Sequence, residues 1–126
     1  MSISNYAEAK ILDHVLRYGT APWTAPSTIY LALHTSDPGE AYTSGEVSGG
    51  SYARQTITFS AASGGSIAAS AAVEFTSMPA CTVTHVSLWD SASGSTNMLW
   101  SGALTSSRAV SAGDSLRITS LTVTLD

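Results

Sequence analysis

The sequence contains little charge. Only 11% of its 126 residues are charged, against about 25% in an ordinary soluble domain, and Lys10 is the single lysine. The four arginines stand far apart along the chain, and the formal net charge is −4. Because phosphate contacts require clustered basic side chains, this composition argues against nucleic-acid binding.

The sequence also lacks the residues from which disulfides and common metal sites are built. Cys81 is the single cysteine, so a disulfide within the chain and a cysteine-based zinc site are both excluded. We expect its thiol to be buried and inert. His14, His34 and His85 show neither HxH nor HExxH spacing, and no metal site or cofactor is predicted from them.

Long hydrophobic runs are absent as well. No stretch approaches the roughly 20 apolar residues of a membrane-spanning helix. The first ten residues do not show the charged-then-apolar pattern of a signal peptide. We therefore expect no membrane span and a protein that folds in the cytoplasm of the cell that makes it.

Small hydroxyl side chains are abundant, and there are enough apolar residues for a core. Ser and Thr supply 37 residues, and 44% of the chain is hydrophobic. A domain of this length buries roughly two-thirds of its unfolded surface, so we predict one domain over residues 1–126. A surface rich in hydroxyls and poor in charge repels other proteins weakly, which favours a protein that packs against many neighbours.

One amphipathic helix is predicted at the start of the chain, over residues 1–19. Asn5 is a suitable N-cap and Glu8 follows three residues later, which is typical of a capping box. Gly19 supplies a C-terminal cap, and Pro22 stops the helix. We expect the apolar stripe to pack on the sheets or on a neighbouring subunit. It consists of Ala7, Ile11, Leu12, Val15, Leu16 and Tyr18.

Beyond residue 27 the apolar residues recur with a period of two. Short alternating runs separated by turn residues predict an antiparallel β-sandwich over 27–126, jelly-roll-like and of about seven or eight strands. The alternating runs are 28–34, 52–60, 66–75, 82–90, 97–104 and 116–125.

Two local features refine this prediction. Gly64-Gly65 lies between two alternating runs and indicates a tight hairpin. In the last run the apolar residues change from even to odd positions after Ile118. A one-residue β-bulge near Thr119 and Ser120 would keep both sets facing the core.

The connection over residues 35–51 shows no alternation and contains Pro38 and four glycines. A connection of this length without structure is uncommon unless it binds something or becomes ordered on assembly. Asp37, Glu40 and Glu46 place three carboxylates in it, which makes a calcium site conceivable. Their spacing does not match an EF-hand, and solvated loop carboxylates are the simpler interpretation.

No arrangement of residues typical of an active site is visible. A GxSxG elbow and a phosphate-binding glycine motif are both missing. Trp23, Trp89 and Trp100 could stack on sugars, although packing in a core or an interface is the commoner use of tryptophan. We therefore predict a protein that is not an enzyme.

Several runs of residues together match a known pattern. This pattern resembles a family of short proteins from tailed bacteriophages and prophages that usually carry the label tail fibre protein. The resemblance covers nearly the whole chain. The matching runs are Tyr6-Ala7-Glu8, Tyr30-Leu31-Ala32-Leu33-His34, Thr35-Ser36-Asp37-Pro38, Gly45-Glu46-Val47-Ser48-Gly49-Gly50-Ser51-Tyr52-Ala53-Arg54-Gln55, Thr82-Val83-Thr84-His85-Val86, Leu99-Trp100-Ser101-Gly102-Ala103-Leu104 and Leu121-Thr122-Val123-Thr124-Leu125-Asp126.

The resemblance implies a structural protein of a tailed-phage virion, folded in the bacterial host. It would assemble on the particle exterior as a tail fibre, fibre adaptor or tail-tip component. We expect a symmetric homo-oligomer, with a trimer as one candidate, in contact with other virion proteins of the tail or with the major capsid protein. Two alternatives stay open, namely a capsid decoration (cement) protein and a carbohydrate-binding receptor module; no host receptor is identified.

An interface is predicted at the N-terminal helix or the 35–51 connection. Trp23, Tyr52 and Arg54 are its candidate anchors, because arginine and aromatic residues are enriched in buried interface centres. Asp37 and Glu46 are the loop carboxylates expected to contribute to the same interface. No catalytic, metal or cofactor-binding residue is predicted.

Overall fold

The computed structural model describes residues 1–17, 22–42, 44–94 and 97–125. This part of the chain contains one helix and nine strands, and every strand pairing is antiparallel. The predicted mainly β fold with an N-terminal helix is therefore confirmed. In chain order the elements are β1 (Ser2–Ile3), α1 (Asn5–Leu16), β2 (Ile29–His34), β3 (Gln55–Ile57), β4 (Ser66–Ala68), β5 (Val73–Phe75), β6 (Cys81–Trp89), β7 (Met98–Val110), β8 (Leu116–Ile118) and β9 (Thr122–Thr124).

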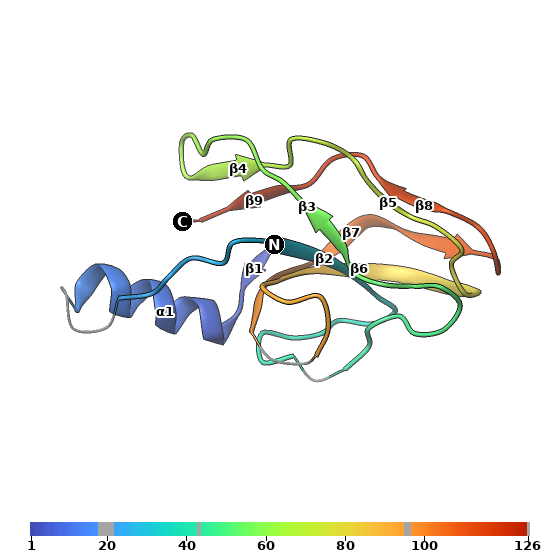
Figure 1. Cartoon of the computed structure of the whole chain (residues 1–126), viewed down its shortest axis with the longest axis horizontal. Helices are drawn as coiled ribbons and strands as arrows, with labels where there is room; N and C mark the ends of the chain where they lie inside the picture. The colour runs from blue at the N-terminus through green and yellow to red at the C-terminus, as the bar shows by residue number, and fades with distance from the viewer. Residues whose placement is uncertain (18–21, 43, 95–96, 126) are drawn as a thin grey trace.

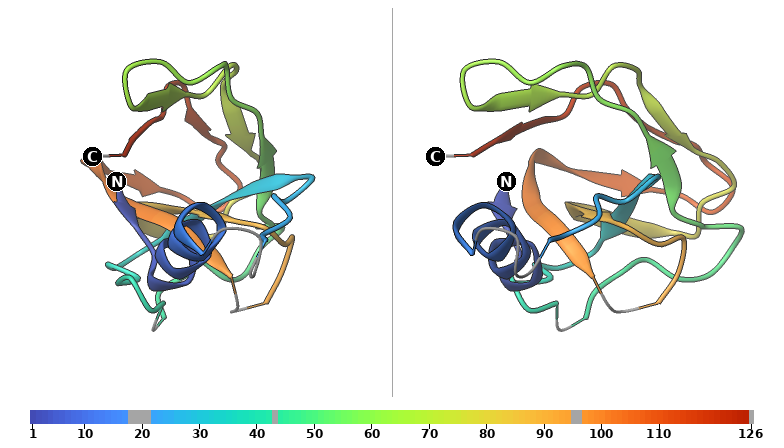
Figure 2. Two further views of the ribbon diagram at one scale, coloured as in Figure 1. Left: turned by 90° about the vertical axis from the view of Figure 1, so that its left-hand side faces the viewer. Right: turned by 60° about the vertical axis from the view of Figure 1, so that its left-hand side comes forward.

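The strands form two layers (Figure 1). One layer is a five-stranded sheet in the order β1-β7-β6-β2-β3. The other consists of two small sheets, β4-β9 and β5-β8, which lie above the first layer and curve over it (Figure 2). Strand β3 rises from the first layer toward the second and contacts β5, so it links the two. The jelly-roll-like strand order that we expected is not established by this topology.

The main core fills the space between the layers, and a second, smaller cluster lies on the other face of the large sheet. Leu31 and Leu33 of β2 belong to the main core, whereas Ala32 packs with Trp89 and Met98 in the small cluster. Alternation placed Ile29, Leu31 and Leu33 on one face of β2 and the residues between them on the other. Both faces are buried near its end because the segments 35–51 and 90–94 cover the outer face.

The helix begins one residue away from the predicted cap. Ser4, not Asn5, is the N-cap: its backbone is extended, and its Oγ accepts a hydrogen bond from the Ala7 N–H at 3.1 Å. The preceding residues are not helical, because they form β1 and pair with Trp100 and Ser101 of β7. With the cap at Ser4, the third helical residue is Ala7, so the predicted capping box with Glu8 does not form. The predicted caps and contacts at 18–19 lie outside the described residues.

The turn predictions have mixed outcomes. Gly64 and Gly65 both have positive φ, and Ser63 and Ser66 exchange two backbone hydrogen bonds of 2.9 and 3.1 Å, which confirms the tight hairpin. The last run is not one bulged strand. It breaks between Ile118 and Thr122 into β8 and β9, which pair with different partners, β5 and β4.

The pairing of β6 with β7 contains irregularities that sequence reasoning did not place. The register shifts between Val83 and His85 and again between Leu88 and Trp89, and in both places the additional residues lie in β7. Val83 and Val86 both belong to the main core. The alternating pattern had placed these two valines on opposite sides.

Candidate functional site

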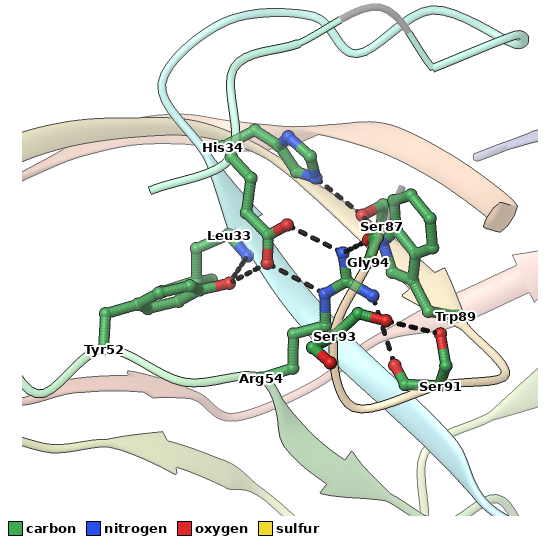
Figure 3. Close-up of polar contacts among 10 residues, drawn as sticks. Leu33, His34, Tyr52, Arg54, Ser87, Trp89, Ser91, Ser93 and Gly94 are labelled. Carbon is green, nitrogen blue, oxygen red and sulfur yellow. Dashed lines mark hydrogen bonds and ion pairs between the residues drawn. The ribbon is translucent and has the colours of Figure 1, made fainter. Parts of the chain in front are cut away.

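Arg54 is the centre of a buried polar network (Figure 3). Its side chain is only 2% exposed. Its Nε and Nη2 donate to the two carboxylate oxygens of Glu46 at 2.9 and 2.8 Å, which is the bidentate geometry that makes such pairs strong. Its Nη1 donates to the Ser91 carbonyl at 3.1 Å and its Nη2 to the Gly94 carbonyl at 2.6 Å. One guanidinium therefore joins the 35–51 loop to the connection after β6.

Arg54 lies just before β3, which begins at Gln55. The alternating pattern over 52–60 had placed its side chain on the polar face. Since the strand has not yet begun at this residue, that alternation does not set the direction of its side chain. Arg54 is buried and the neighbouring Ala53 is exposed, so the pattern is wrong at this end of the run.

Tyr52 and Glu46 complete the link between the loop and β2. The Tyr52 hydroxyl donates to Glu46 Oε1 and accepts from the Leu33 N–H, both at 3.0 Å. The Tyr52 ring stacks on Phe75, with 5.9 Å between the ring centroids. Val47 N–H also donates to the Leu33 carbonyl at 2.9 Å. The loop segment around Glu46 is thus held against β2 by both its backbone and its side chains.

Ionisation in the network follows from this geometry. Burial alone would raise the pKa of Glu46, but the hydrogen bonds and charge of Arg54 outweigh it and hold that pKa below its usual value. Burial raises the pKa of Tyr52, even though the Leu33 N–H acts in the opposite direction. Glu46 is therefore charged and Tyr52 neutral over the physiological pH range. The Arg54 guanidinium thus has a carboxylate as its ion-pair partner.

An aromatic and hydroxyl cluster lies beneath the guanidinium. Arg54 sits 3.9 Å from the ring centroid of Trp89, a cation–π arrangement. The Trp89 indole Nε1 donates to Ser87 Oγ at 2.6 Å, and the same oxygen lies 2.6 Å from His34 Nε2. Tyr42 contacts Trp89 edge-on, with centroids 4.9 Å apart. Burial lowers the pKa of His34 to about 4, so this imidazole is neutral at pH 7.

The Ser87–His34 contact resembles half of a nucleophile–base pair, but the structure closes it to substrate. Both residues have no exposed surface. The Ser87 oxygen is also occupied by the Trp89 indole N–H. A nucleophile must be reachable by the atom that it attacks, so this pair braces the sheet and does not form an accessible reaction centre.

Of the five residues predicted for an interface, three come together and two lie at separate places. Glu46, Tyr52 and Arg54 come together in the network described above. Asp37 is exposed elsewhere in the loop, where it accepts a hydrogen bond from the Gly39 N–H at 2.9 Å. Trp23 lies beside α1. The four hydrogen bonds of the Arg54 side chain are made within this chain. A contact of Arg54 with another chain therefore stays a prediction.

Trp23 joins the segment before β2 to the helix. Its ring meets Tyr6 edge-on, with centroids 6.4 Å apart, and its backbone N–H donates to His14 Nδ1 at 3.0 Å. Neither this role of His14 nor the contact between Ser87 and His34 was predicted from the sequence. No local motif marks these residues, because their partners are distant in sequence.

The structure also bears on the metal site, the sugar-stacking tryptophans, the cysteine and the membrane span that the sequence analysis considered. Among the described residues, no three His, Cys, Asp or Glu side chains gather as a metal site. Trp89 has no exposed surface, so it cannot stack on a sugar. Cys81 is partly buried, and burial raises the pKa of its thiol. No helix in the described part of the chain is long and apolar enough to span a membrane.

Two surfaces of the molecule are apolar and open. The first, which we call the helix ridge, is formed by Leu12, Val15 and Leu16 of α1. The second, the β4–β9 cleft, is a cavity of about 340 Å³ between the two layers. Its lining comprises Ile29, Phe59, Ala62, Gly65, Ser66, Ile67, Leu88, Leu99, Trp100, Val123 and Leu125.

These features define a small antiparallel β protein with a braced loop and open apolar surfaces. Residues 2–126 match the family described as "Podophage GP4 fiber I protein gp80". The chain belongs to this family of phage fibre proteins, which confirms the resemblance found in the sequence. None of the curated proteins matches the chain.

Proposed function

We propose that the chain is a non-enzymatic structural component of a podophage virion and assembles on the particle exterior as part of a fibre or of the adaptor that attaches it. The observation that carries the proposal is the family match, which spans residues 2–126.

The Arg54 network supports a role in assembly. It joins the 35–51 loop to the segment 91–94 through a bidentate pair to Glu46 and two contacts to backbone carbonyls. A loop ordered before it meets its partner loses less conformational entropy on binding. We therefore propose that the exposed side of this loop, which includes Asp37, contacts another virion protein, while Arg54 and Tyr52 support it from beneath.

The composition fits the same role. Hydroxyl side chains and little charge give a surface that neighbouring subunits can cover without burying many ions. Fibres are arranged around particle axes, so we propose a closed homo-oligomer with a trimer as the first candidate. Trp23 completes the proposed contact region from the helix side.

Copy number tests the proposal. Purified particles of the phage that encodes the chain would be digested, and the ratio of this protein to the major capsid protein measured by quantitative mass spectrometry. A ratio of a few per cent supports a fibre component. A ratio close to one, or a simple large fraction, identifies a capsid cement protein, and absence from the particle rejects any virion role.

A loop variant tests the proposed contact. Asp37→Lys changes the charge of the exposed loop side, and Glu74→Lys makes the same change on β5, where Glu74 is also exposed. We expect the loop variant to be depleted from particles and the control to be incorporated normally. Equal incorporation of both would reject the loop as a contact. Glycan-array binding by the wild-type chain would instead favour a receptor module.

A further inference from the structure

The helix ridge exposes large apolar side chains to solvent. Among the described residues, four large apolar side chains are exposed, and three of them are on α1: Leu12 (56%), Val15 (63%) and Leu16 (72%). They lie at i, i+3 and i+4, so they share one face. The charged residues Lys10, Asp13 and Arg17 lie on the other side of the helix, where Lys10 contacts the Tyr6 ring and Arg17 pairs with Asp13.

The chain's own sheets do not cover this ridge. Only Ala7 of the helix is fully buried. The helix is fixed at its start by the Ser4 N–H, which donates to the Leu99 carbonyl at 2.8 Å, and by a hydrogen bond from Ser4 Oγ to the Met98 carbonyl. Trp23 contacts the first turn of the helix through Tyr6 and the last turn through His14. The predicted apolar stripe is therefore buried at Ala7, near the start of the helix, and exposed from Leu12 to its end.

The fourth exposed apolar residue, Leu125 (52%), lines the β4–β9 cleft. The cleft is lined almost entirely by apolar side chains and lacks any charged residue. Its volume of about 340 Å³ compares with a cavity of about 150 Å³ that accommodates one benzene. Two branched aliphatic side chains therefore fit into it.

Trp100 lines the cleft, while its indole Nε1 is buried and has no acceptor in the described part of the chain. Because this atom has almost no accessible surface, a chain docked in the cleft would contact the apolar lining and not this N–H. Val15 and Leu16 of the ridge lie in the last turn of α1, where both side chains are exposed.

We propose that the helix ridge of one copy docks into the β4–β9 cleft of a second copy. One chain presents both an apolar ridge and an apolar cleft of matching size, and the four large apolar residues that are exposed in the described part of the chain lie on these two surfaces. Val15 and Leu16 enter the cleft and pack against its apolar lining. The contact is reciprocal in a dimer or propagates around a ring. This inference rests on the proposed assembly role and names the contact that would build it.

Cross-linking between two single-cysteine variants tests the contact. In a Cys81→Ser background, Leu16→Cys is mixed with Leu125→Cys or with Ala62→Cys, which lines the same cleft. A disulfide between the two variants can form only between different copies. We expect rapid mixed dimers in both mixtures and none when Leu16→Cys is mixed with Ser107→Cys, an exposed site on β7. Absence of the mixed disulfide in both cleft mixtures overturns the proposal.

Self-association of the full chain gives a second measurement. Sedimentation equilibrium should show that Leu16→Lys weakens association by about tenfold or more, as loss of one buried leucine predicts, whereas Ser107→Lys leaves it unchanged. In the wild type, the Trp100 indole N–H resonance should shift as oligomers form. A wild type that stays monomeric, or a cleft filled by another virion protein or a small apolar ligand, overturns self-docking.

The two proposals fail separately. If the protein is found in fibres but Leu16→Lys changes neither association nor incorporation, the docking contact is wrong and the proposed function stands. If the purified chain associates through ridge and cleft but is absent from particles, the function is wrong and the contact stands.

Discussion

Replacing Arg54 with leucine should remove more stability than any change at an exposed arginine. The variant deletes four hydrogen bonds and the contact with the Trp89 ring. It leaves the Glu46 carboxylate without its counter-ion, and it leaves the carbonyls of Ser91 and Gly94 without these donors. The 35–51 loop would lose its main link to the sheet.

The magnitude follows from burial. Removing one partner of a buried ion pair costs about 3–5 kcal/mol. Because the Glu46 side chain is 19% exposed, water can partly solvate the orphaned carboxylate, so the lower part of this range applies. Loss of the contact with Trp89 adds about 1 kcal/mol. We expect the free energy of unfolding to fall by about 3–4 kcal/mol, and Tm by roughly 10–20 °C for a chain of this size.

Urea denaturation followed by tryptophan fluorescence measures this loss, with Arg108→Leu as the matched control. Arg108 is exposed on β7, so its replacement should change stability by less than about 0.5 kcal/mol. A double-mutant cycle with Glu46→Gln should give a coupling energy of about 1–3 kcal/mol. If Arg54→Leu proved as mild as Arg108→Leu, the network would not hold the loop and the reasoning would be refuted.

Three further changes test other parts of the fold. The pKa of His34 is about 4 in the folded chain, against an ordinary value of 6.5, so between these two pH values the unfolded chain binds more protons. The free energy of unfolding should therefore fall by up to about 3 kcal/mol as the pH drops from 6.5 to 4. Denaturation of His34→Gln over the same pH range should show a smaller fall. Gly50→Ala places a Cβ 2.9 Å from the Ser77 carbonyl at positive φ, and should cost about 2 kcal/mol or more in unfolding free energy; Gly64→Ala, with positive φ but open space, should cost about 1 kcal/mol, and equal losses would contradict the clash. Ser4→Ala removes the helix cap and should lower stability by about 1–2 kcal/mol in thermal denaturation, whereas a loss below about 0.3 kcal/mol would contradict the capping role.

Local patterns predicted the parts of the fold that depend on near neighbours. The apolar period located α1 and most strands, and the Gly64-Gly65 pair located a hairpin, because helix faces and tight turns are set within a few residues. The cap was misplaced because Ser4 and Asn5 are both suitable caps. The pairing of Ile3 with Trp100, far along the chain, decides between them.

The network was only partly predictable for the same physical reason. Tyr52, Arg54 and Glu46 stand out by residue type, and the sequence marked all three as candidates for one site. Two acceptors of Arg54 are the backbone carbonyls of Ser91 and Gly94, which every residue possesses, so no sequence signal identifies them. Burial of Arg54 depends on how distant loops fold over the sheet, and residue type could not reveal that it turns inward.

A cryo-EM reconstruction of the particle tests the central claim most directly. The account predicts density for this fold in an external fibre or at its attachment site, with several copies around an axis. The large sheet β1-β7-β6-β2-β3 and the projecting helix α1 would identify it. Density for the same fold spread over the capsid lattice, or its absence from the particle, would contradict the claim.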